Sequence, residues 1–254
     1  MLSPRDTRYK FACELAKQAG QIALGYQQRL KQEGLTIDIK GQQDFVSEAD
    51  KATESYIRKA LEKTFPEDGF LGEESGASLS EKGGVWVVDP IDGTTNFLRK
   101  QPIWCVSIAF LQDDEPMIGI IYDASRGELF SAIKGQGAWL NGQKLKVNQQ
   151  GDEVVGLVNL GYSNKVSLES YFNTIQRLLE NGIEHRRTGS AALALAHVAS
   201  GQFDGFREDA LNAWDMMAGV LIAAEAGATV FVSPIESGYK VQVSIPSIAD
   251  LLAG

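Results

Sequence analysis

One short segment, Trp86–Phe97, constrains the fold of this chain more than any other. Its apolar, valine-rich start predicts a buried strand, and Pro90 predicts the point at which strand character ends. The strand then delivers two carboxylates, Asp89 and Asp92, to its exposed end. Pro90 fixes one backbone angle and Gly93 allows the main chain a close approach, so we expect this turn to be stiff.

The residues after the turn add a second kind of binding group. If Thr94 to Phe97 begin a helix, the free N–H groups of Gly93, Thr94 and Thr95 point the same way as the two carboxylates. Carboxylates attract cations, whereas free N–H groups attract anions. The segment therefore predicts a metal ion and a phosphate group bound side by side.

Composition and charge limit the partners of such a site. The chain has 254 residues, of which 44% are hydrophobic, enough for a sizeable core in one large domain or two closely packed halves. It carries 24 basic and 33 acidic residues, a net charge of -9, which argues against nucleic acid or an anionic membrane as the main partner. An acidic protein that acts on an anionic substrate needs an intermediary, and bound divalent cations would serve.

Cysteine usage and the N-terminal sequence indicate the compartment. Cys13 and Cys105 lie far apart in apolar contexts, which predicts two reduced, buried thiols. Residues 1–30 mix charge throughout and no apolar run approaches membrane-spanning length, so we expect neither a signal peptide nor a membrane span. These features predict a cytoplasmic protein.

Two helices are predicted before the central segment. Apolar residues at three-and-four spacing predict a long helix over 9–30, and a second helical pattern begins near Asp50. Between them, the polar stretch 34–43 with Lys40 is either an active-site lid or an ordinary solvated loop. Taken alone, Asp50 is placed like a helix-capping acid and Glu73-Glu74 like a solvated surface pair.

Beyond the central segment the pattern changes to short strands. Apolar runs at 106–111, 117–122 and 129–133, separated by turn residues, predict antiparallel hairpins. Asn141-Gly142 predicts one more, two-residue hairpin. We therefore expect an antiparallel sheet in this half of the chain.

The polar stretch 148–153 predicts a boundary between an N-terminal half, 1–150, and a C-terminal half, 151–254. Strand and helix patterns alternate in the second half, which indicates a layered α/β arrangement. Strands are expected at 154–160, 184–187, 203–206 and 228–232, and helices at 168–179, 191–199 and 213–226. Asp215 falls in the first turn of the last helix, where capping is the ordinary role of an acid.

Several short motifs occur in order along the chain. They are Gly72-Glu73-Glu74, Asp89-Pro90-Ile91-Asp92-Gly93-Thr94-Thr95-Asn96, and Trp214-Asp215 with Ala218-Gly219 and Glu225-Ala226-Gly227, supported by residues 44–50, 134–138 and Asn141-Gly142. Together they resemble the signatures of the inositol monophosphatase family, and the resemblance runs from the first helix to about residue 232. A single D-x-x-D-G-T match is weak, but the ordered set at family-like spacing is specific.

The resemblance implies a sugar-phosphatase fold of the α+β class, with α-β-α-β-α layers, and commonly a homodimer. It implies a magnesium-dependent, lithium-sensitive phosphomonoesterase with two or three metal ions, for which Mn²⁺ is a possible substitute. Carried over by position, the first metal ion would be bound by Glu73, Asp89 and the carbonyl of Ile91, the second by Asp89, Asp92 and Asp215, and a third, weaker ion by Asp50 with Glu73. The family pattern also implies that Thr94 and Glu73 orient the attacking water.

The residue types support this chemistry independently. Oxygen ligands without Cys or His suit Mg²⁺ or Mn²⁺ rather than zinc. His185 and His197 lie away from every motif and are not expected to be catalysts. Two carboxylates about 4 Å apart repel by roughly 4 kcal/mol at an effective dielectric constant near 20, so five of them converge only with cations present. Two metal ions activate water and stabilise the leaving alkoxide, which predicts direct in-line attack by water without a covalent phosphoenzyme.

The substrate side of the site rests on fewer residues. The resemblance places Gly189-Ser190-Ala191 in a small-residue loop at a helix start, and Glu208 where the family holds substrate hydroxyls. The alternative is plain packing for the loop and a solvated Glu208. Arg186 and Arg187 either meet a second anionic group or lie on the surface, and we expect the surface.

Departures from the family pattern concern the substrate rather than the metals. Met217 replaces a small alanine and Ala228-Thr229 replaces a second glycine. The resemblance therefore predicts a small phosphorylated substrate such as inositol 1-phosphate, with histidinol phosphate, fructose 1,6-bisphosphate or a nucleotide 3′-phosphate as alternatives. A non-catalytic metal-dependent binding protein is the hypothesis from a different class, but it has no need of the water-orienting pair Thr94 and Glu73.

Overall fold

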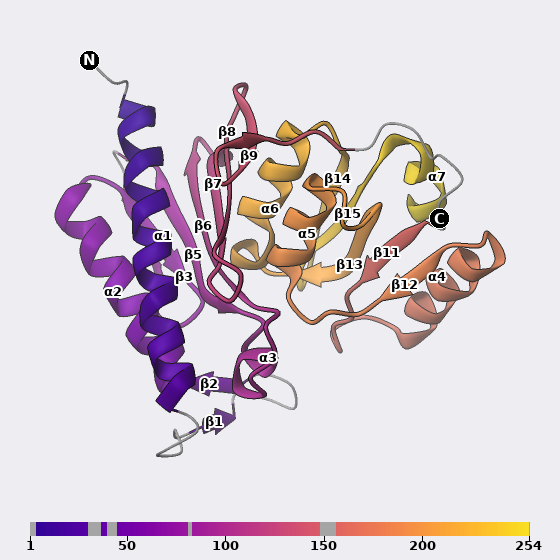
Figure 1. The fold of residues 1–254 in the computed structure, drawn as a ribbon, viewed down its shortest axis with the longest axis horizontal. Helices are drawn as coiled ribbons and strands as arrows, with labels where there is room; N and C mark the ends of the chain where they lie inside the picture. The colour runs from indigo at the N-terminus through magenta and orange to yellow at the C-terminus, as the bar shows by residue number, and fades with distance from the viewer. Residues whose placement is uncertain (1–3, 30–36, 40–44, 81–82, 148–155, 254) are drawn as a thin grey trace.

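Five layers, alternating between helix and sheet, make up the fold (Figure 1). The structure is a computed structural model that describes residues 4–29, 37–39, 45–80, 83–147 and 156–253. The layers are α1 (Pro4–Arg29) with α2 (Glu48–Thr64), an eight-stranded sheet, α5 (Ala191–Ala199) with α6 (Ala213–Glu225), a five-stranded sheet, and α4 (Leu168–Glu180) with α7 (Ala249–Ala253). The layered α+β fold predicted from the sequence is confirmed. None of the described helices is long and apolar enough to cross a membrane.

The eight-stranded sheet has the order β10-β9-β8-β7-β6-β5-β3-β4. Its neighbours pair antiparallel, except β3 and β5, which run parallel. The strands are β3 (Gly69–Gly72), β4 (Gly76–Ser78), β5 (Val85–Asp92), β6 (Cys105–Gln112), β7 (Glu115–Asp123), β8 (Glu128–Ile133), β9 (Gly137–Leu140) and β10 (Gln143–Lys144). The predicted hairpin at Asn141-Gly142 is confirmed, because these residues join β9 to β10 with φ angles of 49° and 80°.

Strand β5 continues past Pro90, so the prediction that the strand ends there is wrong. Asp89 pairs with Ser107 and Asp92 with Cys105, which leaves one extra residue in β5, a β-bulge. Proline lacks an N–H group and is tolerated where the ladder is interrupted in this way. In a regular strand, residues three apart point to opposite faces, so the bulge is what allows both carboxylates to face one space.

The five-stranded sheet is also mixed, with the order β12-β11-β13-β15-β14. Strand β11 runs parallel to β12 and β13, whereas β15 runs antiparallel to β13 and β14. The strands are β11 (Leu157–Leu160), β12 (Glu184–Arg186), β13 (Gly205–Leu211), β14 (Thr229–Ile235) and β15 (Gly238–Ser244). The sequence predicts no strand after residue 232. Strand β15 was not predicted because its sequence lacks the usual signal. Residues 241–244 are all buried, and a strand buried on both faces is normally a continuous apolar run, but Gln242 and Ser244 are polar.

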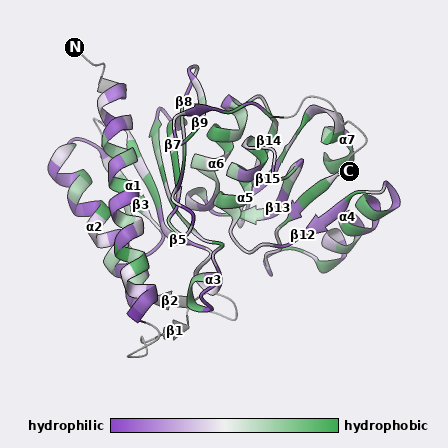
Figure 2. Ribbon diagram, in the orientation of Figure 1, coloured by the Kyte–Doolittle hydropathy of each residue, from purple (hydrophilic) through white to green (hydrophobic). Residues whose placement is uncertain are grey.

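Helices α5 and α6 form the apolar centre of the molecule (Figure 2). They lie between the two sheets, and a helix covered on all sides is apolar all round. The two helices cross closely at Gly219, where a Cβ atom would lie 2.6 Å from the Cβ of Leu195. This pair fixes the first turn of α6, and with it Asp215, against the inner strands of the first sheet, where the hydroxyl of Ser107 on β6 donates to the carbonyl of Trp214.

The remaining elements are short. Helix α3 (Thr94–Leu98) follows β5, and a 3-10 helix, η1 (Pro246–Ile248), precedes α7. Strands β1 (Ile37–Ile39) and β2 (Phe45–Ser47) pair antiparallel, so part of the predicted connection 34–43 is a strand. The alternation of Ile, Asp and Ile at 37–39 is the signal for it. Lys40 and the predicted boundary at 148–153 lie outside the described residues.

A buried histidine in α5 gives the fold a testable pH dependence. The ring of His197 packs against Phe130 and Phe203, and its Nε2 atom has no hydrogen-bond partner among the described residues. Burial, aided by Arg126, lowers the pKa of His197 to about 4. Below pH 6.5 the unfolded chain binds a proton that the folded protein does not, so stability falls as the pH drops toward 4, by about 2 kcal/mol at pH 5.

His197→Leu is expected to remove this loss. Urea unfolding at pH 7 and at pH 5 gives the loss of unfolding free energy between the two pH values for each protein. The wild-type loss minus the variant loss is the contribution of His197. Equal losses in the two proteins would show that His197 is not responsible.

Candidate functional site

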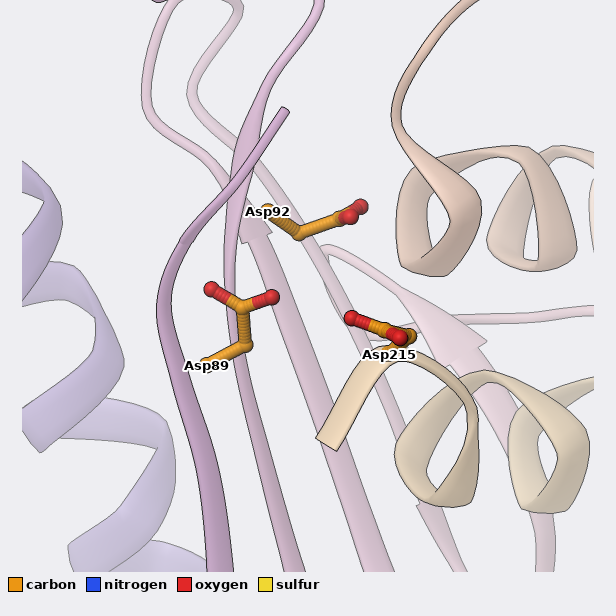
Figure 3. Close-up of side chains that lie close together, drawn as sticks. All are labelled: Asp89, Asp92 and Asp215. Carbon is orange, nitrogen blue, oxygen red and sulfur yellow. The ribbon is translucent and has the colours of Figure 1, made fainter. Parts of the chain in front are cut away.

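Three aspartates converge between the two sheets (Figure 3). Asp89 and Asp92 lie on the bulged end of β5, and Asp215 lies in the first turn of α6. One carboxylate oxygen from each lies within 4.8 Å of the others. Asp89 and Asp92 are buried, and Asp215 is partly buried. The structure thus brings together three residues that the sequence resemblance assigns to the metal centre.

Repulsion among carboxylates dominates the electrostatics of this cluster. Burial raises the pKa of Asp89 well above its usual value, and Glu73, Asp92, Asp215 and Asp50 raise it further, in that order. The pKa of Asp215 is raised to about 7, first by burial and then by Asp92. The other four predicted acidic ligands therefore all lie close enough to affect Asp89. Such a cluster attracts a cation.

Glu73 lies in the turn after β3, beside the end of β5. Its N–H group donates to the carbonyl of Val88 at 3.3 Å. The next N–H group, of Glu74, donates to the buried carboxylate of Glu54 on α2 at 2.8 Å. A Cβ atom on Gly72 would lie 2.4 Å from that carboxylate, so only glycine fits there. Buried contacts on both sides thus hold the backbone that carries Glu73.

Thr94 links the turn after β5 to helix α2. Its Oγ1 atom lies 3.1 Å from the carbonyl oxygen of Ile91 and 3.5 Å from Oδ1 of Asp50. Asp50 is 1% exposed in the first turn of α2, so it is a contact of the site as well as a first-turn acid. Gly93 precedes α3 with φ 94°, a conformation that favours glycine, and Thr94 and Thr95 open that helix.

Asp92 has a structural role that the sequence does not reveal. Its carboxylate accepts hydrogen bonds from the hydroxyl of Ser190 and from the N–H groups of Ala191, Ala192 and Leu193, at 3.2, 2.8 and 3.4 Å for the three N–H groups. It therefore caps the N-terminus of α5, nearly 100 positions away in the chain. Ser190 and Ala191, which the sequence assigns to the substrate, contact Asp92 in this structure.

A cleft of about 580 Å³ opens beside the aspartates. Asp92 and Asp215 line one part of it, and the loops after the parallel strands β11 and β12, with β13, line another. Carboxyl ends of parallel strands meet at one sheet edge, where ligands bind in open α/β sheets. The predicted substrate residues Gly189, Ser190, Ala191 and Glu208 all line the cleft, as does Thr95.

The two neighbouring arginines, Arg186 and Arg187, have different surroundings. Arg186 is exposed and pairs with Glu184. Arg187 is exposed as well, as expected for both arginines, and it also lines the cleft. Arg186 is the last residue of β12, and Arg187 is the first residue after it.

Two asparagines hold this loop and were not assigned a role from the sequence. The amide of Asn96 donates to the carbonyls of Ile103 and Thr188, each at 2.8 Å. The amide of Asn159 donates to the hydroxyl of Thr188 at 2.7 Å. Asn96 could have been found from the sequence, because it belongs to the central motif. Asn159 lies in β11 outside every motif, so the sequence held no signal for it.

The side chain of Glu208 packs against Gly161, where there is no room for a Cβ atom. A Cβ atom on Gly161 would lie 1.8 Å from Oε2 of Glu208. Burial, together with Asp215 and Asp92, raises the pKa of Glu208 to about 8. Gly161→Ala is expected to displace this carboxyl group and to lower the free energy of unfolding by about 1–3 kcal/mol, the usual cost of overpacking.

Urea unfolding measures the effect of Gly161→Ala. Gly25→Ala is the matched control, because a Cβ atom at Gly25 in α1 meets nothing within 4 Å. If both variants are as stable as the wild type, Glu208 does not need Gly161.

The buried thiol beside the cluster is not suited to metal binding. Cys105 Sγ donates to Oδ2 of Asp92 at 3.7 Å, and burial raises the pKa of Cys105 well above its usual value. The thiol therefore stays protonated, and the available ligands are oxygens. His185 on β12 and His197 on α5 belong to neither the cluster nor the cleft lining.

The fold and the site define a protein with two mixed sheets between helices and an acidic, oxygen-only candidate metal centre. The sequence profile described as the inositol monophosphatase family matches residues 5–237, and the chain belongs to that family. The acidic cluster is consistent with the metal site typical of the family.

Named relatives support the assignment. "Nus factor SuhB" of Pasteurella multocida is 38% identical over 223 residues, which cover 86% of this chain and 82% of the relative. The solved structure of the extragenic suppressor protein suhB from Bartonella henselae superposes with a TM-score of 0.87 at 32% identity, covering 96% of both chains. That of inositol monophosphatase from Anabaena superposes with a TM-score of 0.82 at 32% identity, covering 98% of this chain and 94% of the other.

Proposed function

We propose that this protein is a magnesium-dependent phosphomonoesterase that hydrolyses a small polyol phosphate such as inositol 1-phosphate. The convergence of Asp89, Asp92 and Asp215, with Glu73 and Asp50 close by, is the observation that carries the proposal. Histidinol phosphate, fructose 1,6-bisphosphate and nucleotide 3′-phosphates are the alternative substrates. A non-catalytic binding protein is the least favoured alternative.

The donor set fits Mg²⁺, with Mn²⁺ as a substitute. Carboxylates and a backbone carbonyl are the hard oxygen ligands that these ions prefer. We assign one ion to Glu73, Asp89 and the carbonyl of Ile91, and a second to Asp89, Asp92 and Asp215, with Asp50 at a third. When bound, the cations would neutralise the phosphoryl oxygens and make a water molecule more acidic.

The side chains around the metal centre divide the remaining work. The hydroxyl of Thr94 has one hydrogen, which it donates to Ile91 or Asp50, so its lone pairs are left to accept a hydrogen bond from the attacking water. Glu73 takes the proton of that water as general base. The N–H groups of Gly93, Thr94 and Thr95 bind phosphate oxygens.

On the substrate side, Glu208 accepts hydrogen bonds from hydroxyl groups of the polyol. Gly189 leaves space at the cleft wall. These assignments need no covalent phosphoenzyme, because water attacks phosphorus in line with the leaving oxygen.

Phosphate release from a substrate panel tests the proposal. The panel contains inositol 1-phosphate, histidinol phosphate, fructose 1,6-bisphosphate and 3′-phosphoadenosine 5′-phosphate, each titrated with Mg²⁺ with and without lithium. Magnesium-dependent, lithium-inhibited release is expected. Absence of release from every compound at all magnesium concentrations would refute the activity.

The names of the relatives favour a second candidate function. Several proteins that are 36–40% identical to this chain are named Nus factors, which points to a role with the transcription machinery. The net charge of -9 favours a protein partner over direct contact with nucleic acid. Binding to purified transcription complexes, compared at low and high salt, tests this role. A homodimer in the cytoplasm is proposed for either function, and sedimentation of the purified protein tests the oligomeric state.

A further inference from the structure

Arg187 is the only cation among the described residues that line the cleft. The acids of the same lining are Asp92, Glu208 and Asp215. Arg187 lies just after β12, on the wall built from the second sheet, whereas Asp92 and Asp215 belong to β5 and α6. A ligand that fills the cleft with its phosphate at the aspartates therefore presents its other end to the wall that carries Arg187.

The guanidinium of Arg187 is held by Tyr162, which follows β11. Its Nη2 atom donates to the carbonyl oxygen of Tyr162 at 3.3 Å, and its Cζ atom lies 5.7 Å from the centroid of the Tyr162 ring. Two contacts to one residue restrict the position of this side chain in the cleft lining. Pre-ordering of this kind lowers the conformational-entropy cost of fixing the side chain when a ligand binds.

The binding capacity of this guanidinium is largely unused. An arginine has five N–H donors, and among the described residues no carboxylate lies within ion-pair distance of Arg187. Arg187 acts on Glu208 only at longer range, where its charge opposes the rise in the pKa of that carboxyl group. The free donors of the planar guanidinium can bind two oxygens of one phosphate or carboxylate, and the opposite charges strengthen both hydrogen bonds. A neutral hydroxyl group accepts from one donor and adds no charge attraction.

We propose that Arg187 is a specificity-determining residue that binds a second anionic group on the substrate. The inference rests on the proposed phosphomonoesterase activity of the same cleft, and it moves the preferred substrate from inositol 1-phosphate to the alternatives that carry a second anionic group. Phosphomonoesters with a second phosphate or a carboxylate are preferred over neutral polyol phosphates. Fructose 1,6-bisphosphate and 3′-phosphoadenosine 5′-phosphate belong to the preferred class, and inositol 1-phosphate does not.

Arg187→Gln tests the proposal, with Arg186→Gln as the matched control. Arg186 is the adjacent arginine, but it contacts Glu184 and the carbonyl of His185 and does not line the cleft. kcat/KM is measured for fructose 1,6-bisphosphate and for inositol 1-phosphate with each protein. Arg187→Gln should lower kcat/KM for the bisphosphate roughly 10- to 100-fold and for inositol 1-phosphate less than about threefold. Arg186→Gln should change neither, and the preference for the bisphosphate should weaken as salt is raised.

Two results would overturn the proposal: an equal loss on both substrates, or no loss on either. Thermal unfolding with Mg²⁺ and fructose 1,6-bisphosphate separates this inference from the proposed activity. If the wild type hydrolyses nothing yet gains stability from the bisphosphate, and Arg187→Gln loses that gain, the anion position is supported while the phosphatase activity is refuted. If inositol 1-phosphate is hydrolysed and Arg187→Gln behaves as the wild type on both compounds, the activity stands and the anion position is refuted.

Discussion

Glu73→Gln is expected to reduce kcat by about 10³-fold or more while leaving the fold intact. Glutamine keeps the shape of the side chain but removes the proton acceptor and one charge of the metal centre. The backbone of the turn stays in place, because the N–H groups of Glu73 and Glu74 hold it through Val88 and Glu54. Loss of a carboxylate that repels Asp89 also removes strain from the metal-free protein. Phosphate release under single-turnover conditions, with urea unfolding of the same protein, measures both effects.

Glu74→Gln is the matched control for this experiment. Glu74 is the next residue of the same turn, and it is its backbone N–H group that bonds to Glu54. Its activity should stay within about threefold of the wild type. Undiminished turnover by Glu73→Gln would contradict the proposed mechanism, since no other described residue is assigned the role of general base.

The acidic core of the site could be predicted from the sequence because local rules fix it. A valine-rich strand that ends in D-x-x-D-G-T carries two carboxylates on one element, and a first-turn acid such as Asp215 starts a strongly apolar helix. Pro90 misled the strand prediction, since a bulge can accommodate a proline. The error moved the end of the strand but not the position of the carboxylates.

The cleft could not be predicted to the same extent, because its contacts join distant segments. Asp92 caps a helix that begins 99 positions later in the chain, at Ala191. Arg187 and Tyr162 meet only because β11 and β12 are parallel neighbours. Periodicity and spacing report which face of an element is apolar, but not which loop lies beside it. Glu208 was predicted only in part. The family resemblance identified it as a substrate residue, but only the structure shows that it packs against Gly161.

Mg²⁺ is expected to raise Tm, and Asp215→Asn is expected to raise Tm of the metal-free protein while removing most of the magnesium effect. Carboxylate oxygens of Asp89, Asp92 and Asp215 lie within 4.8 Å of one another, and at that separation each ionised pair repels by about 3–4 kcal/mol at an effective dielectric constant near 20. Asparagine relieves this repulsion and still offers an oxygen to the N–H group of Asn212, which donates to Asp215 at 2.7 Å.

The size of the magnesium effect follows from mass action. Magnesium at about 100 times its dissociation constant stabilises the folded state by about 2.7 kcal/mol, which corresponds to roughly 5–10 °C in Tm for a chain of this size. Thermal unfolding at neutral pH in chelator and in excess Mg²⁺, at matched ionic strength, measures it. Glu62→Gln is the control, because Glu62 is an exposed acid on α2 that pairs with Arg58 and should keep the full magnesium shift. A wild-type Tm that is indifferent to Mg²⁺, or an Asp215→Asn variant that retains the whole shift, would remove these aspartates from the metal centre and with them the basis of the proposed activity.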